Sequence, residues 1–281
     1  MRAVPALFGL SSCLLWLATA PPPSQAQTPA DRKDAGASLQ PPDCTAPAGI
    51  TRFRVRLPNT VRAIRHGGEL TIVAIGSSST EGVGASEPAR SYPSQLAAAL
   101  TRSWPKLKIR VVNKGVGGED ATGMLRRFEN DVLPYAPQLV IWQVGSNYTL
   151  RDRDIEAYVT ILSKGINRLK AANIDVVLMD LQYAPRVLDK PAHRRVLNTM
   201  RTLSGDLQVA VFQRFEIMRY WVSSGGVRME DIVAPDRLHM NDASYACIGR
   251  LLAENLTAAA KLAPPAPGQA DNAAAVHPSA R

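Results

Sequence analysis

Apolar residues fall into two kinds of segment that alternate along the chain. Short segments are nearly continuous in apolar and β-branched residues, which is typical of buried strands, and longer ones repeat apolar residues at helical spacing. The predicted strands are 70–76, 107–113, 138–145, 174–180 and 207–213, and the predicted helices are 91–103, 120–133, 152–172, 190–205 and a last one after Asn241. Because such strands need a cover on both faces, the pattern predicts a three-layer α/β/α sandwich on a flavodoxin-like parallel sheet of about five strands.

The two ends of the chain differ from this pattern. Residues 1–26 combine Arg2, an apolar stretch to about Ala20 and the small residues 24–26, which predicts a secretory signal peptide cleaved after Ala26. The apolar stretch is short for a membrane span, although an uncleaved N-terminal anchor is an alternative. Composition predicts a linker over 27–47, one folded domain over 48–262 and a disordered tail over 263–281. We therefore expect export to the periplasm or medium, with no stable membrane insertion after cleavage.

The chain is basic, but its charge is not concentrated. The formal net charge is +9, and removal of Arg2 with the signal peptide leaves +8. Basic residues are scattered, without a long run and without interleaved aromatic residues, so nucleic-acid binding is not expected. A basic exported protein can favour an acidic polysaccharide or an anionic envelope, and a solvated basic surface explains the same composition. The sequence gives no indication of the oligomeric state.

Two cysteines remain after the predicted cleavage, Cys44 and Cys247. In an oxidising compartment such a pair is commonly bridged, and a bridge would tie the entering segment to the last helix. Two buried thiols are the alternative. A zinc site is not expected, because no histidine lies near either cysteine in the sequence.

Polar or glycine-rich clusters follow three of the predicted strands, and a fourth lies near the end of the chain. In order they are "GSSST" at 76–80, "NKGVGGED" at 113–120, "GSN" at 145–147 and "APDRLHMND" at 234–242. Functional groups gather outside the carboxyl ends of the strands in parallel sheets. The four clusters therefore predict one site.

The last cluster offers a base for a serine nucleophile. A serine hydroxyl becomes reactive when a base takes its proton, and that base needs a group that orients it. Of the four histidines, only His239 has a carboxylate placed to hold it, Asp236 three residues earlier. An Asp236 that caps the last helix is the alternative, but Asn241 and Asp242 are better placed for the cap. His193 lies among arginines and is expected on a solvated helix surface.

Acyl transfer also needs hydrogen-bond donors for a developing oxyanion. The backbone N–H of Gly118, the side-chain amide of Asn147 and the N–H of the nucleophile itself are candidates. Gly118 also suits a turn that requires a positive φ, which is the structural alternative.

Together the four blocks resemble the SGNH hydrolases, also called the GDSL-like esterase superfamily, whose signature is one Ser, Gly, Asn and His in separate blocks. Residues 76–78 resemble the G-D-S opening, 113–118 resemble N-x-G-x-x-G, 145–147 resemble G-x-N, and 236–239 resemble D-x-x-H. The resemblance implies that Ser78 is the nucleophile, with Asp236 and His239 as orienter and base. It implies an oxyanion hole made by Ser78, Gly118 and Asn147.

Two positions depart from the family pattern. Ser77 replaces the usual Asp of the first block, and Tyr148 replaces the Asp that often follows the third-block Asn. In the family the first Asp supports the loop, a role open to a hydrogen-bonding serine. Ser77 and Ser79 remain rival nucleophiles.

The resemblance implies an exported serine esterase that forms an acyl-enzyme on Ser78 and needs no metal or organic cofactor. Export and the basic surface favour O-acetylated glycans as substrates, with lipids and small esters still open. An acyltransferase of the same fold and an inactive glycan-binding module are the alternatives. The chain lacks G-x-S-x-G, a complete G-x-G-x-x-G and a Walker lysine, so an α/β-hydrolase and a nucleotide-binding protein are not expected.

Overall fold

The computed structural model describes residues 44–224 and 226–262. The expected signal peptide (1–26), the expected linker up to residue 43 and the expected tail (263–281) lie outside the described residues. None of the helices in the described ranges combines the length and the apolar composition that a membrane span needs.

Five parallel strands form one sheet, as predicted. The strands are β1 (Glu69–Gly76), β2 (Lys108–Gly115), β3 (Leu139–Gln143), β4 (Asp175–Met179) and β5 (Ala210–Phe212). Their order is β2-β1-β3-β4-β5, and every neighbouring pair is parallel. This is the flavodoxin-like order, in which the chain reverses its direction of winding next to β1. Residues that follow β1, β2 and β3 therefore share one edge of the sheet.

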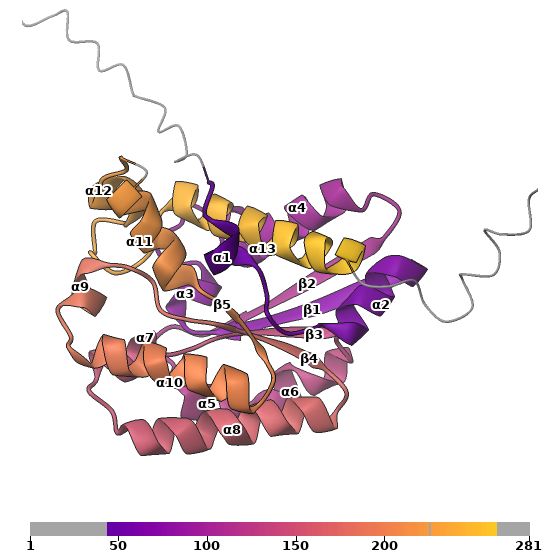
Figure 1. The fold of residues 1–281 in the computed structure, drawn as a ribbon, viewed down its shortest axis with the longest axis horizontal. Coiled ribbons are helices and arrows are strands. Elements are labelled where there is room, and N and C mark those ends of the chain that lie inside the picture. The colour runs from indigo at the N-terminus through magenta and orange to yellow at the C-terminus, as the bar shows by residue number, and fades with distance from the viewer. Residues whose placement is uncertain (1–43, 225, 263–281) are drawn as a thin grey trace, which may run out of the picture. The chain divides into compact units, whose positions relative to one another are not determined.

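Helices cover both faces of the sheet (Figure 1). One face carries α2 (Pro58–His66), α4 (Tyr92–Ser103), α11 (Arg214–Ser224) and α13 (Asp242–Leu262), and the other carries α5 (Ala121–Arg126), α6 (Phe128–Asp131), α8 (Ile155–Ala171) and α10 (Ala192–Asp206). The short helices are α1 (Ala48–Thr51), α3 (Ser78–Glu81), α7 (Ser146–Leu150), α9 (Pro185–Leu188) and α12 (Met229–Ile232), with 3-10 turns at Pro88–Arg90 and Leu133–Tyr135. Of these, α3 and α7 begin at the carboxyl ends of β1 and β3.

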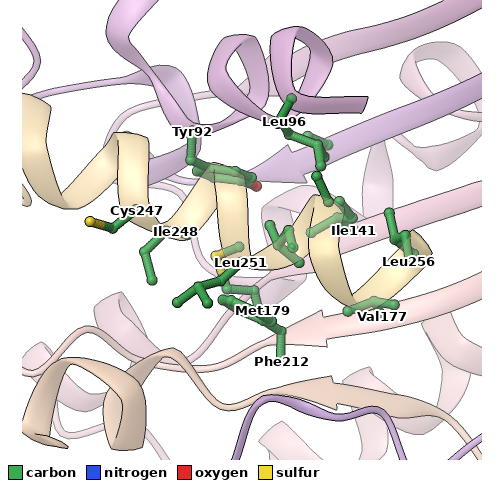
Figure 2. Close-up of a cluster of buried hydrophobic side chains, with 14 of the residues drawn as sticks. Tyr92, Leu96, Ile141, Val177, Met179, Phe212, Cys247, Ile248, Leu251 and Leu256 are labelled. Atoms are coloured by element: carbon green, nitrogen blue, oxygen red, sulfur yellow. The ribbon is translucent and has the colours of Figure 1, made fainter. Parts of the chain in front are cut away.

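Successive strand residues alternate between two separate hydrophobic cores. Ile72 and Ile141 point to the core under α4 and α13, whereas Val73 and Trp142 point to the core under α8 and α10. Figure 2 shows the first core, where α13 lies across the sheet and Leu251 packs above the strands. Burial of both strand faces explains why the sequence shows no polar alternation in these segments.

Three helical regions differ from the prediction. The helix expected at 120–133 is broken into α5, α6 and a 3-10 turn, because Arg127 leaves helical geometry and turns its guanidinium to Glu119 and to the Lys114 carbonyl. Helices α2 and α11 were not predicted. Each lies within three residues of a strand, and α2 has only nine residues.

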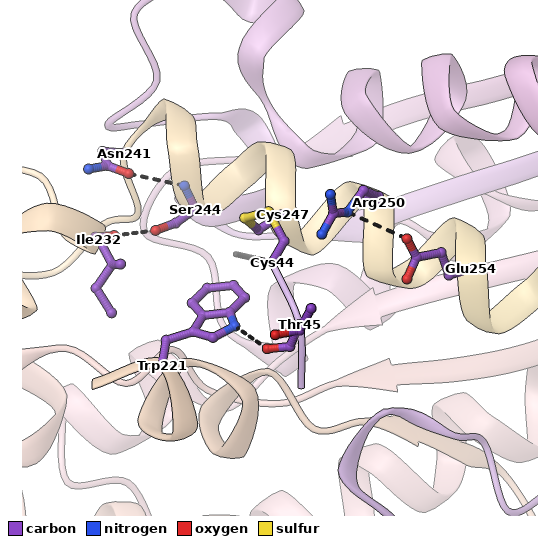
Figure 3. The surroundings of a disulfide bond; sticks show 9 residues. All are labelled: Cys44, Thr45, Trp221, Ile232, Asn241, Ser244, Cys247, Arg250 and Glu254. Atoms are coloured by element: carbon purple, nitrogen blue, oxygen red, sulfur yellow. Dashed lines mark hydrogen bonds and ion pairs between the residues drawn. A yellow bond between two sulfur atoms is a disulfide. The ribbon is translucent and has the colours of Figure 1, made fainter. Parts of the chain in front are cut away.

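A disulfide joins Cys44 to Cys247, with 5.1 Å between their Cα atoms (Figure 3). Cys44 lies in the segment that enters the fold, and Cys247 lies in α13. Beside the bond, the Trp221 indole donates to the Thr45 carbonyl at 3.1 Å. The entering segment is thus held against α11 and α13, two helices from the other end of the described chain.

Candidate active site

The hydroxyl of Ser78 faces the imidazole of His239. Ser78 is the first residue of α3, directly after β1, and its Oγ lies 2.7 Å from His239 Nε2. The other ring nitrogen, Nδ1, hydrogen-bonds to the Asp236 carboxylate. Ser78 and His239, 161 residues apart in sequence, are therefore hydrogen-bonded, and with Asp236 they have the geometry of a Ser-His-Asp triad.

A tight turn holds Asp236 and His239 in this geometry. Asp236 Oδ1 accepts the backbone N–H groups of Leu238 and His239, both at 2.9 Å, and the Ala234 N–H donates to the His239 carbonyl at 2.8 Å. Partial burial raises the pKa of Asp236, but the hydrogen bonds from the His239 ring and from these two N–H groups outweigh it, so the pKa lies below its ordinary value. The carboxylate is thus ionised where it can orient the imidazole.

Only one of the three adjacent serines contacts His239. Ser77 is 2% exposed and its hydroxyl donates to Gln143 Oε1 at 3.1 Å. Ser79 is 1% exposed and its side chain hydrogen-bonds to Tyr245. Ser78 is more accessible than either neighbour and keeps its hydroxyl toward the imidazole. The geometry therefore favours Ser78 over its two rivals.

Three donors follow the carboxyl ends of β1, β2 and β3, at the edge of the sheet that carries Ser78. Gly118 has a φ of 74°, a conformation that favours glycine, and lies in the exposed turn after β2. Asn147 is the second residue of α7, and its Nδ2 donates one hydrogen to the Glu119 carbonyl at 2.8 Å, which leaves its second hydrogen available. The N–H groups of Ser78 and Gly118 have no acceptor within the described ranges. Free donors of this kind suit an oxyanion.

The model of the Non-GDSL lipase-like family matches residues 43–262. The chain belongs to this family. The description "Non-GDSL" agrees with residues 76–78, where Ser77 stands in the place of the Asp in G-D-S. Among curated protein sequences, none matches the chain.

Solved structures of esterases share the fold. A two-domain esterase active on acetylated mannans aligns with a TM-score of 0.62 at 21% identity over 78% of this chain and 60% of its own. An acetylxylan esterase from Geobacillus stearothermophilus aligns with a TM-score of 0.56 at 19% identity over 68% of this chain and 95% of its own. The chain thus spans about 60% of the length of the first esterase and nearly all of the second.

Gln143, at the end of β3, supports the loop of Ser78, a contact that the sequence did not predict. Its Oε1 accepts the N–H of Ser77 at 2.9 Å and the hydroxyls of Ser77 and Thr80, both at 3.1 Å. Gln143 is itself 1% exposed. In this member of the Non-GDSL lipase-like family, a glutamine on the neighbouring strand thus anchors the loop that carries Ser78. The one feature of the sequence that could have indicated Gln143 is its polar amide at the end of the apolar run "LVIWQ".

Gln182 connects the third block to the loop of His239 and was also missed. Its Oε1 accepts the Ser146 hydroxyl at 2.7 Å and Arg214 Nη2 at 2.9 Å, and its Nε2 donates to the Leu238 carbonyl at 3.3 Å. Arg214 is fully buried and also donates twice to the Asp180 carbonyl. No pattern in the sequence marks these contacts, since they join segments far apart in the chain.

Arg151 holds the turn of Gly118. Its Nη2 donates to the Gly118 carbonyl at 2.6 Å, and Nη1 lies 3.6 Å from the Asp120 carboxylate. Asp120 in turn caps α5 by accepting the N–H groups of Thr122 and Gly123. With the bond from Asn147 to the Glu119 carbonyl, these contacts fix the two peptide groups that follow the Gly118 N–H.

The expectation for His193 is wrong. His193 is 8% exposed, its Nδ1 lies 2.6 Å from the Lys190 carbonyl oxygen, and its ring stacks on Phe215. The flanking arginines point outward while the histidine faces the core, which the charged run concealed. Asn241 caps α13 as expected by accepting the Ser244 N–H at 3.1 Å, whereas Asp242 instead binds Ser86.

Tyr148, which stands where relatives often have Asp, is 5% exposed and packs on the Tyr158 ring. It serves the core beneath α7 rather than the surface of the site. Among the described residues, no group of three His, Cys, Asp or Glu side chains is arranged to hold a metal ion.

Proposed function

We propose that the protein is an exported serine esterase that hydrolyses carboxylic ester bonds, with O-acetyl groups on glycans as the substrate class. One observation carries the proposal: the Ser78 hydroxyl lies 2.7 Å from the His239 imidazole, whose far nitrogen is bonded to Asp236. The family and the two esterase folds support an ester substrate. The names of those esterases, which act on acetylated mannan and on acetylxylan, support acetylated glycans.

In the proposed first half-reaction His239 Nε2 takes the Ser78 proton while Oγ bonds to the ester carbonyl carbon. The N–H groups of Ser78 and Gly118 and the Asn147 amide stabilise the oxyanion of the tetrahedral intermediate. The intermediate collapses to an acyl-enzyme, and the alcohol leaves with the proton from Nε2. Asp236 stays ionised and stabilises the imidazolium through Nδ1.

In the second half-reaction a water molecule takes the place of the alcohol. His239 removes a proton from it, the resulting hydroxide attacks the acyl carbonyl, and Ser78 recovers its proton as the carboxylic acid leaves. A sugar hydroxyl in place of water would make the protein an acyltransferase, so the acceptor separates the two functions.

The test is hydrolysis of p-nitrophenyl acetate by the purified protein and by Ser78→Ala. We expect the variant to lose at least about a thousandfold in kcat, as removal of a triad nucleophile does elsewhere. Ser103→Ala, an exposed serine at the end of α4, is the matched control and should retain full activity. Equal activity in all three proteins would reject Ser78 as the nucleophile.

Substrate class is tested with acetylated xylan and acetylated mannan beside p-nitrophenyl esters of increasing chain length. Release of acetate from the glycans, with falling activity on longer chains, is the expected result. Preference for long-chain esters would reject the glycan assignment while leaving the esterase intact. Acetylated oligosaccharide formed with an added sugar acceptor would indicate transfer.

Export is proposed from the sequence of residues 1–26 and from the disulfide, which fits an oxidising compartment. Mass spectrometry of the protein recovered from the periplasm or medium should give a chain that begins at Gln27. Recovery of the uncleaved chain with membranes would favour the N-terminal anchor instead.

A further inference from the structure

A basic groove lies beside α2, along the amino ends of β3 and β4 and the edge strand β5. It consists of three hollows along segment 52–59, α2, the amino ends of β3 and β4, and β5. The first two hollows share Asn59 and Asn173, and the second and third share Arg54, so they run into one another. The basic residues that line them are Arg52, Arg54, Arg56, Arg62, His66, Arg168, Lys170 and Arg201.

Four of these arginines are exposed and unpaired. Phe53 and Val55 pack against the core. The three arginines that alternate with them, at positions 52, 54 and 56, are exposed, as is Arg62 in α2. Arg52, Arg54, Arg56 and Arg62 make no side-chain hydrogen bond or ion pair with any residue in the described part of the chain. Their guanidinium groups therefore have all donors available for a ligand.

Acidic side chains do not neutralise the groove. Among the described residues that line it, Asp175 is the single acid, and it is 8% exposed. Its carboxylate is already bound by the Thr60 N–H and hydroxyl, both at 2.8 Å, and by Asn59. Arg168 and Arg201 pair with Glu129 and Glu216, which leaves the four unpaired arginines as uncompensated positive charge.

We propose that the basic groove binds an anionic polysaccharide that carries carboxylate groups. A guanidinium group binds a carboxylate through two parallel hydrogen bonds, which a row of arginines can repeat along a polymer. Asn59 and Gln208 lie in the same hollows; their Nδ2 and Nε2 groups donate to Asn173, Asp175 and Gly205, which leaves their side-chain oxygens to accept from sugar hydroxyls. A polymer rather than a small anion fits three neighbouring hollows that share lining residues.

The lining distinguishes this ligand from a membrane or a nucleic acid. The large exposed apolar side chains of the described residues are Val83 and Val116, and neither lines the groove. Apolar insertion, which strengthens binding at a bilayer surface, is therefore missing. No Phe, Tyr or Trp lines the three hollows, so the groove has no platform on which bases could stack.

The position of the groove has a functional consequence. Ser78 follows the carboxyl end of β1, whereas the first two hollows lie at the amino ends of β3 and β4 and the third runs along β5, the edge strand farthest from β1 on that side. A polysaccharide in the groove would hold the protein to the polymer and leave the site of Ser78 open. Binding is thus independent of ester hydrolysis, and Ser78→Ala should bind as the unchanged protein does.

The test is calorimetric titration of the full-length mature protein with polygalacturonate, with neutral dextran as the comparison polymer. The variant Arg52→Gln/Arg54→Gln/Arg56→Gln should weaken binding by about tenfold or more, since exposed ion pairs contribute modestly and add up over three sites. The matched control Arg102→Gln/Arg194→Gln/Arg195→Gln removes the same charge from exposed positions of α4 and α10 and should bind nearly as the unchanged protein does. Melting temperatures of both variants verify that they are folded.

Added salt should weaken the interaction, because exposed charges are screened. Equal losses in the two triple variants would overturn the proposal, since net charge alone would then explain binding. Binding to equimolar phosphatidylglycerol–phosphatidylcholine vesicles or to duplex DNA in preference to polygalacturonate would overturn it as well. Loss of esterase activity in Ser78→Ala with retained binding separates this proposal from the function of the active site.

Discussion

The side-chain oxygen of Gln143 lies 2.9 Å from the backbone nitrogen of Ser77 and 3.1 Å from its hydroxyl oxygen. Both residues are almost completely buried. One acceptor on β3 thereby holds both the N–H and the hydroxyl of the residue that precedes Ser78. A loop at the end of β1 is held from the neighbouring strand rather than by an acid of its own.

Gln143→Leu should lower kcat by about tenfold with little change in KM, because loss of the bonds to Ser77 and Thr80 displaces Ser78, and a displaced nucleophile weakens the transition state more than the bound substrate. Gln143→Glu keeps an acceptor at the same place and should recover part of the loss. Steady-state kinetics with p-nitrophenyl acetate measure both. A rise in KM at constant kcat would contradict a positioning role for Gln143.

The difference between Gln143 and Ser78 shows what a sequence of this kind can reveal. Ser78, Asp236 and His239 lie in short blocks whose residues are close in sequence. Strand alternation places the block of Ser78 at the edge of the sheet, and the resemblance to a known family connects it with the block of Asp236 and His239. Gln143 acts across strands, and Gln182 acts across loops, so their roles depend on packing that no local pattern records. His193 was expected on the surface because arginines flank it in the sequence, whereas its contacts with Lys190 and Phe215, which bury it, depend on packing.

Secondary structure follows the same division. The five strands were predicted because burial on both faces leaves continuous apolar runs, and their ends agree with the structure to within three residues at each end. Helix α11 was missed because it begins at Arg214, two residues after the last residue of β5, so no turn residue in the sequence marks where the strand ends and the helix begins. The break after α5 depends on contacts of Arg127 with distant groups, which periodicity does not show.

Arg151 should be a positioning residue for the oxyanion donor at Gly118. Because its guanidinium fixes the Gly118 carbonyl at 2.6 Å, Arg151→Met should lower kcat several-fold while leaving KM nearly unchanged. Arg151→Lys keeps the charge but loses the planar geometry, so its kcat should lie between that of the unchanged protein and that of Arg151→Met. Arg126→Met, on the neighbouring α5, is the control for a lost charge. A loss of kcat in the control as large as that in Arg151→Met would show that the lost surface charge, and not the bond to Gly118, causes the effect.

Asp180 should make stability depend on pH. Burial raises its pKa to about 7, in spite of the Phe215 N–H bond and the charge of Arg214, whereas the unfolded chain has the ordinary value of 3.8. Between these values the folded protein holds a proton that the unfolded chain has released, so the contribution of this group to stability falls as pH rises and levels off above about 7. Asp180→Asn cannot ionise and keeps the acceptor for Phe215. Its free energy of unfolding in urea should therefore change less over this pH range than that of the unchanged protein, and parallel curves would rule Asp180 out as the source.

The disulfide should stabilise the fold without serving the reaction. Cys44 and Cys247 are 203 residues apart, and closing so long a loop in the unfolded chain contributes at most about 5 kcal/mol in the chain-entropy model. Cys44→Ser/Cys247→Ser should therefore unfold at a markedly lower temperature, and the unchanged protein with a reductant present should unfold at the same temperature as the variant. Near 25 °C both should retain kcat, because the bond lies beside Trp221 and Thr45 while Ser78 and His239 are held by their own loops. If kcat falls at a temperature where circular dichroism shows a folded protein, the link between the entering segment and α13 also positions the catalytic loop.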